Sequence, residues 1–154
     1  MNRIQFYTTE EKFPHGEVTI YQYKENFIAK IVSLFEEKKD LQKKVRILNV
    51  ITHISRHFPI VYKIESAKTM TCSHNFSLVY YISHYNYTLD SYMKKSLKKQ
   101  AMLNDGEIWY ILRSLAEAGS YLQSHKIVFK KLDKKSLWVS PTFEIKIEIE
   151  DLFE

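Results

Sequence analysis

The fold of this chain is decided by residues 104–153, which read NDGEIWYILRSLAEAGSYLQSHKIVFKKLDKKSLWVSPTFEIKIEIEDLF. The stretch opens with Asn104 and, three residues later, Glu107, a helix N-cap with a reciprocal partner at the third helical position. Apolar residues then recur at the three- and four-residue spacing of a helix that packs on a core: Ile108, Ile111, Leu112, Leu115, Ala118 and Leu122. The sequence therefore predicts a helix over residues 107–123.

The hydrophobic period changes from helical to two-residue after Lys126. Residues 127–129 and 137–139 are predicted to form two short strands joined by a charged turn. After the Ser-Pro-Thr turn at 140–142, residues 144–150 alternate strictly between charged residues and isoleucine. This alternation predicts a strand with one face in water.

This order of one long helix and short strands resembles the catalytic half-site of the protein kinase family. Residues 121–140 read YLQSHKIVFKKLDKKSLWVS, which resembles the helix end and catalytic loop that kinases write roughly as YLHSxxIVHRDLKxxNILL. Residues 144–151 read EIKIEIED and stand where the strand leading to Asp-Phe-Gly belongs. The resemblance implies a kinase-like frame whose positions can be compared with this chain one by one.

Most residues that carry kinase chemistry are different in this match. Lys131 stands at the aspartate of His-Arg-Asp, which acts as base in a kinase, and the histidine and arginine are replaced too. Ser136 takes the place of the magnesium-binding asparagine, and Ile149 takes the place of the Asp-Phe-Gly aspartate. A slip of two residues would instead put Asp151 at that aspartate. The resemblance therefore implies a chain that is not an enzyme and has no catalytic residues.

The earlier part of the chain supplies the other half of the resemblance. Its patterns run strand–strand–strand–helix–strand–strand and then helix, at residues 4–8, 17–24, 27–32, 34–55, 60–64, 76–82 and 89–97. That order is similar to a kinase small lobe, an antiparallel sheet plus one long helix, followed by the first helices and hairpin of a truncated large lobe. The predicted fold class is α+β, with residues 1–154 forming one truncated kinase-like domain, small-lobe-like over 1–83 and partly large-lobe-like over 84–154.

Nucleotide binding is not favoured by the residues at the expected positions. The motif FIAK places Lys30 at the nucleotide-contacting lysine of the family. The glycine-rich cover is missing, because the first loop offers only Gly16 and contains a proline, which has no amide donor. The helix positions for a partner of Lys30 hold Gln42 and Lys44, although two glutamates nearer the helix start leave such a pair open. We expect no cofactor and a vestigial role for Lys30, and a divergent phosphotransferase is the least favoured function.

No metal site is predicted, although the spacing of two histidines would allow one. His53 and His57 are four residues apart in a predicted helix and could present both imidazoles to one ion. No cysteine or carboxylate cluster lies near them in the sequence. The one cysteine, Cys72, excludes an internal disulfide and fits a reducing compartment.

The chain is mildly basic, with 23 Lys and Arg against 18 Asp and Glu and a formal charge of +5. No run of eighteen or more apolar residues is present, so no membrane contact is predicted. A cytoplasmic protein is expected, including cytoskeletal or ciliary assemblies. Lysine pairs form a candidate basic face, and a nucleic-acid or polyanion-binding module is the alternative function. The members of this face are Lys94, Lys95, Lys98, Lys99, Lys130, Lys131, Lys134 and Lys135.

The long helix carries a wider apolar surface than one core-facing stripe requires. Burying a large aliphatic side chain is worth roughly 1.5–3 kcal/mol, so leaving several in water would cost more than a marginal domain can spare. We therefore expect a partner interface at Ile108, Ile111, Leu112, Leu115, Ala118 and Leu122, extended by an uncovered edge of the strand at 144–150. The predicted function is a non-catalytic, kinase-like (pseudokinase) scaffolding subunit, whose partners are other protein subunits of a larger assembly.

Overall fold

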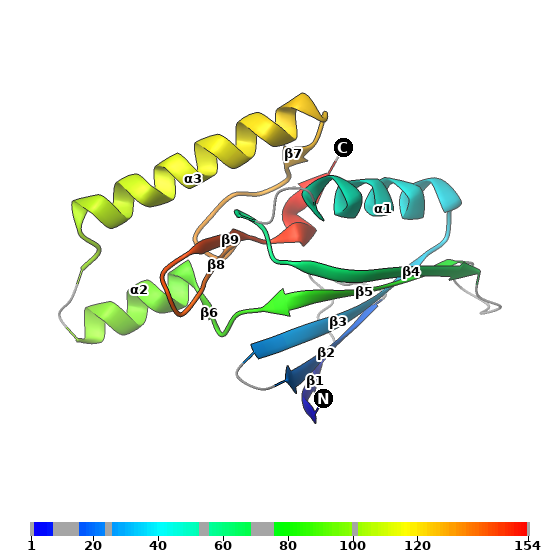
Figure 1. Cartoon of the computed structure of the whole chain (residues 1–154), viewed down its shortest axis with the longest axis horizontal. Helices are drawn as coiled ribbons and strands as arrows, with labels where there is room; N and C mark the ends of the chain where they lie inside the picture. The colour runs from blue at the N-terminus through cyan, green and yellow to red at the C-terminus, as the bar shows by residue number, and fades with distance from the viewer. Residues whose placement is uncertain are drawn as a thin grey trace. The chain divides into compact units, whose positions relative to one another are not determined.

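The computed structural model describes residues 2–7, 16–23, 26–52, 56–68, 76–99 and 102–153. The chain divides into two compact units (Figure 1). The first unit contains Met1–His53 and Ile60–His84, and the second contains Ile54–Pro59 and Tyr85–Glu154. The second unit therefore includes a short segment that comes between the two parts of the first unit in the sequence.

The first unit is built on a five-stranded antiparallel sheet, and the predicted strands are confirmed. They are β1 (Asn2–Tyr7), β2 (Gly16–Tyr23), β3 (Asn26–Phe35), β4 (Val61–Lys68) and β5 (Phe76–His84). Their order in the sheet is β1-β2-β3-β5-β4, and every neighbouring pair is antiparallel. β3 and β4 are longer than predicted, and the loop at 11–15, where a glycine-rich cover would lie, falls outside the described residues.

One helix, α1 (Lys38–Thr52), packs against this sheet (Figure 1). Buried residues alternate along the strands, as Ala29 and Ile31 do in β3. Their cross-strand partners in β5, Ile82 and Tyr80, are buried as well. α1 adds a stripe at helical spacing, Leu41, Ile47, Leu48 and Ile51, and so completes the core of the first unit.

The helix predicted from residue 34 begins at Lys38 instead. Leu34 and Phe35 belong to β3, where they pair with residues of β5. Their backbone groups are used in the sheet ladder, so the helix can begin only after the ladder ends. Asp40 in the first turn suits the positive end of the helix dipole. The predicted end of the helix, residues 53–55, lies outside the described part of the chain.

The second unit contains two further helices, α2 (Leu89–Lys98) and α3 (Asp105–Ser124), and several short strands (Figure 1). Strands β6 (Tyr87–Thr88), β8 (Leu137–Val139) and β9 (Ile145–Ile147) form an antiparallel sheet in the order β6-β8-β9. Strand β7 (Val128–Phe129) pairs with β10 (Leu152–Phe153), which follows a 3-10 helix, η1 (Ile149–Asp151). Within the described ranges, no helix combines the length and the apolar character needed to cross a bilayer.

Each end of α3 has capping hydrogen bonds between residues that are close in the sequence. At its start, Asn104 Oδ1 accepts the N–H of Glu107 at 2.8 Å, and Glu107 Oε1 accepts the N–H of Asn104 at 3.1 Å. The predicted N-cap is therefore confirmed. At its end, Lys126 has a φ of 59°. The N–H groups of Lys126 and of the next residue donate to carbonyls of the last turn at 3.0 Å, the Schellman pattern that usually takes glycine.

The strands predicted at residues 127–129 and 137–139 are present, but they do not pair with each other. β7 pairs with β10, and β8 pairs with β9. Burial differs between the two pairs, because Val128 of β7 is 46% exposed. Two of the three facing pairs of β8 and β9 are at most 4% exposed: Leu137 with Ile147, and Val139 with Ile145.

The strand predicted over residues 144–150 is limited to β9, because residues 149–151 form the 3-10 helix η1, and β9 has no face in water, contrary to the prediction. Lys146 and Glu148 are 6% and 7% exposed. Lys146 Nζ donates to the carbonyl of Arg56 at 2.9 Å, and Glu148 accepts the indole N–H of Trp138 at 2.7 Å. Charged groups can be buried only with such partners, and an alternating pattern does not reveal whether the partners exist.

The prediction that the edge of β9 is uncovered is also wrong. The N–H of Ile147 donates to the carbonyl of His57 at 2.8 Å, whereas the bond from the N–H of Glu148 to the carbonyl of Ser136 continues the pairing with β8. Phe58, in the same segment as His57, is 0% exposed. The described part of Ile54–Pro59 therefore covers the edge that the sequence predicted to be open.

Candidate functional sites

The three positions that match the kinase base and metal ligands are occupied by structural contacts. Lys131 is exposed, and its ammonium lies 3.4 Å from the carboxylate of Asp133. Ser136 is 2% exposed, and its hydroxyl donates to the carbonyl of Lys131 at 3.3 Å. Ile149 is 0% exposed. The side chain of Asp151, the alternative metal ligand, lies outside the described residues, and the loss of catalysis stays a prediction.

Asp133 organises this turn, although the sequence analysis did not single it out. Its carboxylate accepts the N–H of Lys135 at 2.8 Å and the N–H of Ser136 at 3.1 Å. The Lys135 N–H, followed by the side chains of Lys131 and Ser136, holds the pKa of Asp133 below its usual range. An aspartate that bonds backbone amides two and three residues on is a common turn signal, so the pattern Asp-Lys-Lys-Ser could have indicated it.

Lys30 lies half-buried in β3, between partners in β2 and β5. It forms no ion pair with the carboxylates of the described ranges, and Glu37 pairs with Lys39 at 3.0 Å instead. Lys44, at one of the helix positions expected to face Lys30, lies 5.7 Å from the centroid of the Tyr80 ring. A vestigial nucleotide contact at Lys30 therefore stays a prediction.

Across the described ranges, no group of three or more His, Cys, Asp or Glu side chains could hold a metal ion. His53 and Cys72 lie outside those ranges. His57 is 4% exposed, and its Nε2 lies 3.0 Å from Oε2 of Glu117 on α3. Glu117 also accepts the Nε–H of Arg113 at 2.9 Å, and this bond, followed by that of His57, lowers the pKa of the Glu117 carboxyl. The cluster ties the segment Ile54–Pro59 to α3.

Two lysines of the predicted basic face, Lys94 and Lys134, meet at Asp90. Its carboxylate lies 3.0 Å from Lys94 Nζ and 3.6 Å from Lys134 Nζ, which joins α2 to the turn that follows β7. The hydrogen bond from Lys94 holds the pKa of Asp90 below its usual range. Lys95 Nζ donates to the hydroxyl of Tyr87 at 3.2 Å. Four exposed members form no ion pair within the described residues: Lys98, Lys99, Lys130 and Lys135.

The predicted interface residues of α3 fall into two groups. Three of them belong to the core rather than to an exposed surface, contrary to the expectation: Ile111 is 8% exposed, Ala118 0% and Leu122 1%. The other three are accessible, since Ile108 is 43% exposed, Leu112 is 52% exposed and Leu115 is half-buried. Whether they contact a partner stays a prediction.

Trp109 is the most exposed large apolar residue of α3, at 70%, and the sequence analysis missed it. It lies outside the apolar period of the helix. A large aromatic residue at a position that this period does not assign to the core could have indicated an exposed apolar surface. Residues three or four apart on a helix are neighbours, so Trp109 and Ile108 both border Leu112. We give the name outer strip to six uncharged residues of α3, which are exposed except for the half-buried Leu115: Ile108, Trp109, Leu112, Leu115, Ala116 and Ser120.

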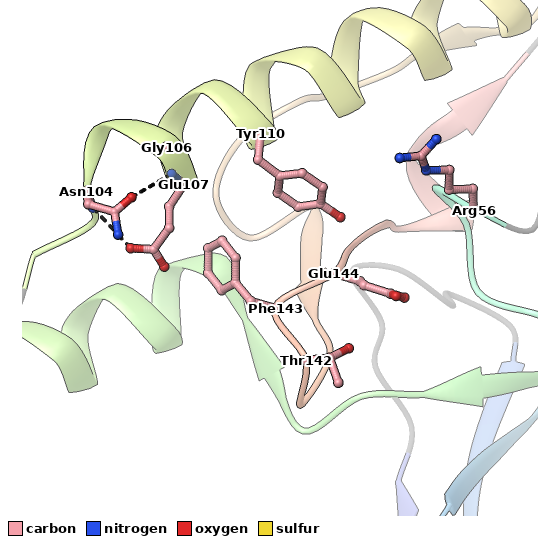
Figure 2. A pocket seen from close by; sticks show the side chains of 8 residues that line it. All are labelled: Arg56, Asn104, Gly106, Glu107, Tyr110, Thr142, Phe143 and Glu144. Carbon is pink, nitrogen blue, oxygen red and sulfur yellow. Dashed lines mark hydrogen bonds between the residues drawn. The ribbon is translucent and has the colours of Figure 1, made fainter.

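A pocket of about 410 Å³ opens beside the first turn of α3 (Figure 2). The rings of Tyr110 and Phe143 line it, with their centroids 6.2 Å apart. The carboxylates of Glu107 and Glu144 and the guanidinium of Arg56 stand around these rings in Figure 2. The pocket thus combines an aromatic wall with charges of both signs.

Several of the pocket residues already have structural partners. Phe143 has a φ of 59°, and its ring packs on Tyr92 with a centroid distance of 5.3 Å. The Tyr110 hydroxyl accepts the N–H of Ile145 at 3.3 Å. Glu107 is engaged in the capping box of α3. The pocket is lined by one cation and two carboxylates, so its charges select neither an anionic nor a cationic ligand.

Comparison with protein-family models finds no match to this chain, and no curated protein matches it significantly. Among the described surfaces, the outer strip of α3 has the clearest physical signal, because large apolar side chains are left in water there.

Proposed function

We propose that this chain is a non-catalytic subunit of a larger protein assembly and that it contacts its partner through the outer strip of α3. The observation that carries the proposal is the exposure of three large apolar side chains on adjacent turns: Trp109 at 70%, Leu112 at 52% and Ile108 at 43%. Clustered apolar exposure of this kind marks interaction sites, and tryptophan is enriched among the residues that dominate binding energy.

The proposal includes a kinase-like frame, that of a pseudokinase with a scaffolding role in the cytoplasm, including cytoskeletal and ciliary assemblies. Its support is the resemblance of residues 121–140 to a kinase catalytic loop, together with an antiparallel sheet and one helix followed by a helical unit. The non-catalytic role is supported by Lys131, Ser136 and Ile149, none of which offers a carboxylate. A base and a metal clamp are both needed for phosphoryl transfer.

Affinity purification of the tagged full chain, followed by mass spectrometry, tests this function. Trp109→Asp and Leu112→Asp should each lower partner recovery at least tenfold, since burying one large apolar side chain contributes about 1.5–3 kcal/mol. Leu97→Asp is the matched control, because Leu97 is 58% exposed on α2 and lies off the strip. Lys30→Ala should leave the assembly intact. Unchanged recovery with both strip variants, in protein whose circular dichroism is native, would refute the proposal.

A second function, the binding of nucleic acid or another polyanion, is favoured by one observation. Asp90 draws lysines of α2 and of the turn after β7 into one region of the second unit. Binding of this kind weakens steeply with salt. If charge reversal at Lys98, Lys99, Lys130 and Lys135 abolishes association while Trp109→Asp leaves it unchanged, this second function replaces the first.

A further inference from the structure

We infer that the partner at the outer strip is a second copy of this chain, packed antiparallel along α3 about a two-fold axis. This inference rests on the proposed function and names the occupant of the same surface. It follows from three properties of α3: where its charges are engaged, how residue size changes along the strip, and how its two ends differ in charge.

Between Ile108 and Ser120, the charged side chains of α3 are Arg113, which neighbours Trp109 and Ala116 of the outer strip, and Glu117. The nearby charges of α3 are engaged elsewhere, Glu107 in the capping box and Arg113 with Glu117 at 2.9 Å. Two copies of the strip can therefore face each other without burying an unpaired charge, because each Arg113 near the axis keeps Glu117 of its own chain as a partner. The exposed lysines of α2 would repel their own copies, so they do not offer an equivalent surface.

Residue size changes along the strip in a way that suits a two-fold axis. Its N-terminal half carries the large residues Ile108, Trp109 and Leu112, and its C-terminal half carries Ala116 and Ser120. The midpoint between Ile108 and Ser120 is at residue 114. An antiparallel pair centred there places Leu112 against Ala116 of the second copy and Ile108 against Ser120 of the second copy. Large residues meet small ones on both sides of the axis, which allows dense packing.

The ends of α3 are complementary in the same arrangement. Asp105 lies in the first turn, and Lys126 is exposed just beyond the last turn and forms no ion pair within the described residues. In an antiparallel pair the acidic start of each helix approaches the basic end of the other, and the two helix dipoles oppose each other. A parallel pair would instead bring Trp109 against Trp109 and the two acidic starts together.

The length of the strip limits the strength of the contact. Its twelve residue steps span about 18 Å at 1.5 Å per residue. One helix from each chain over that length buries less than the roughly 1,200 Å² of a standard interface. The dimer is therefore weak and depends on concentration.

Sedimentation velocity of the full chain over a wide concentration range tests the inference. The wild-type chain should shift from monomer to dimer as its concentration rises. Leu112→Lys and Ala116→Glu, each alone, should weaken dimerisation at least tenfold. Both positions are exposed, so the fold is expected to persist, and circular dichroism checks this. Leu97→Lys, an exposed leucine on α2, is the matched control and should leave dimerisation unchanged.

Mixing the two strip variants tests the register itself. An equimolar mixture of the Leu112→Lys and Ala116→Glu chains should form a heterodimer, because the introduced charges face each other on one side of the axis. On the other side the native contact between Leu112 and Ala116 is kept. A wild-type chain that stays monomeric at every concentration, or a mixture that shows no association, overturns the inference. Equal losses in Leu112→Lys and Leu97→Lys overturn it as well.

Failure of this inference can be told apart from failure of the proposed function. If the chain is monomeric but Trp109→Asp still releases a different protein during purification, the second copy is excluded and the proposed function stands. If Trp109→Asp changes neither self-association nor partner recovery, both fail.

Discussion

Removal of the indole N–H of Trp138 should destabilise the second unit through the buried carboxylate of Glu148. Glu148 is 7% exposed, and its Oε2 accepts this N–H at 2.7 Å. A hydrogen bond to a charged group contributes about 1.5–3 kcal/mol, and its loss here leaves a buried carboxylate with less support. We therefore expect Trp138→Phe to lower the free energy of unfolding by about 2–3 kcal/mol.

Substitutions at Glu148 separate the bond from the buried charge. Glu148→Gln keeps an acceptor but loses the charge, so its cost should be about 1 kcal/mol. The double variant Trp138→Phe with Glu148→Leu should be more stable than Trp138→Phe alone, because no charge is left buried with a missing donor.

Urea titration followed by circular dichroism and tryptophan fluorescence measures these differences. Both tryptophans belong to the second unit, so the fluorescence reports on that unit. Trp109→Phe is the matched control, since Trp109 is 70% exposed and its replacement should cost no more than about 0.5 kcal/mol. If Trp138→Phe costs no more than this control, or if the double variant is the least stable of all, the reasoning about the buried carboxylate is refuted.

Three further predictions concern other parts of the chain. Lys126→Gly should raise the unfolding free energy by about 1 kcal/mol, because glycine adopts the φ of 59° without the penalty of a side chain; an unchanged or lower urea midpoint would contradict this. The pKa of Glu117 is lower in the folded state than its ordinary value of 4.5. The carboxylate therefore stabilises the fold fully above pH 4.5, and this contribution is lost as the pH falls through the lowered pKa. Arg113→Gln should raise the pKa of Glu117 toward the ordinary value, as measured by NMR titration, and an unmoved pKa would show that Arg113 is not the main cause. Magnesium-ATP should leave the melting temperature of the wild-type chain unchanged. A shift that Lys30→Ala removes would contradict this and show that Lys30 contacts a bound nucleotide.

The sequence by itself determined the features that depend on neighbours along the chain. The capping box of α3 needs only Asn104 and Glu107, three residues apart, and the structure has both of its bonds. The strands of the first unit and the limits of α2 follow from local periodicity, which burial against a core imposes on any sequence. The start of α1 was misplaced because the apolar pair Leu34 and Phe35 fits a helix and a strand equally well, and only pairing with β5 decides between them.

Only the tertiary structure decided which polar groups of the second unit are buried. Lys146 reads as a solvent-facing residue of an alternating strand, yet its ammonium donates to a carbonyl of Arg56, 90 residues away in the sequence. Glu148 is likewise buried, because the indole of Trp138 supplies a donor to its carboxylate. The same limit applied to α3, where the apolar pattern could not separate the buried Leu122 from the exposed Leu112. Hydrophobic pattern fixes which residues prefer burial, but burial itself requires partners from distant parts of the chain, and no local pattern contains them.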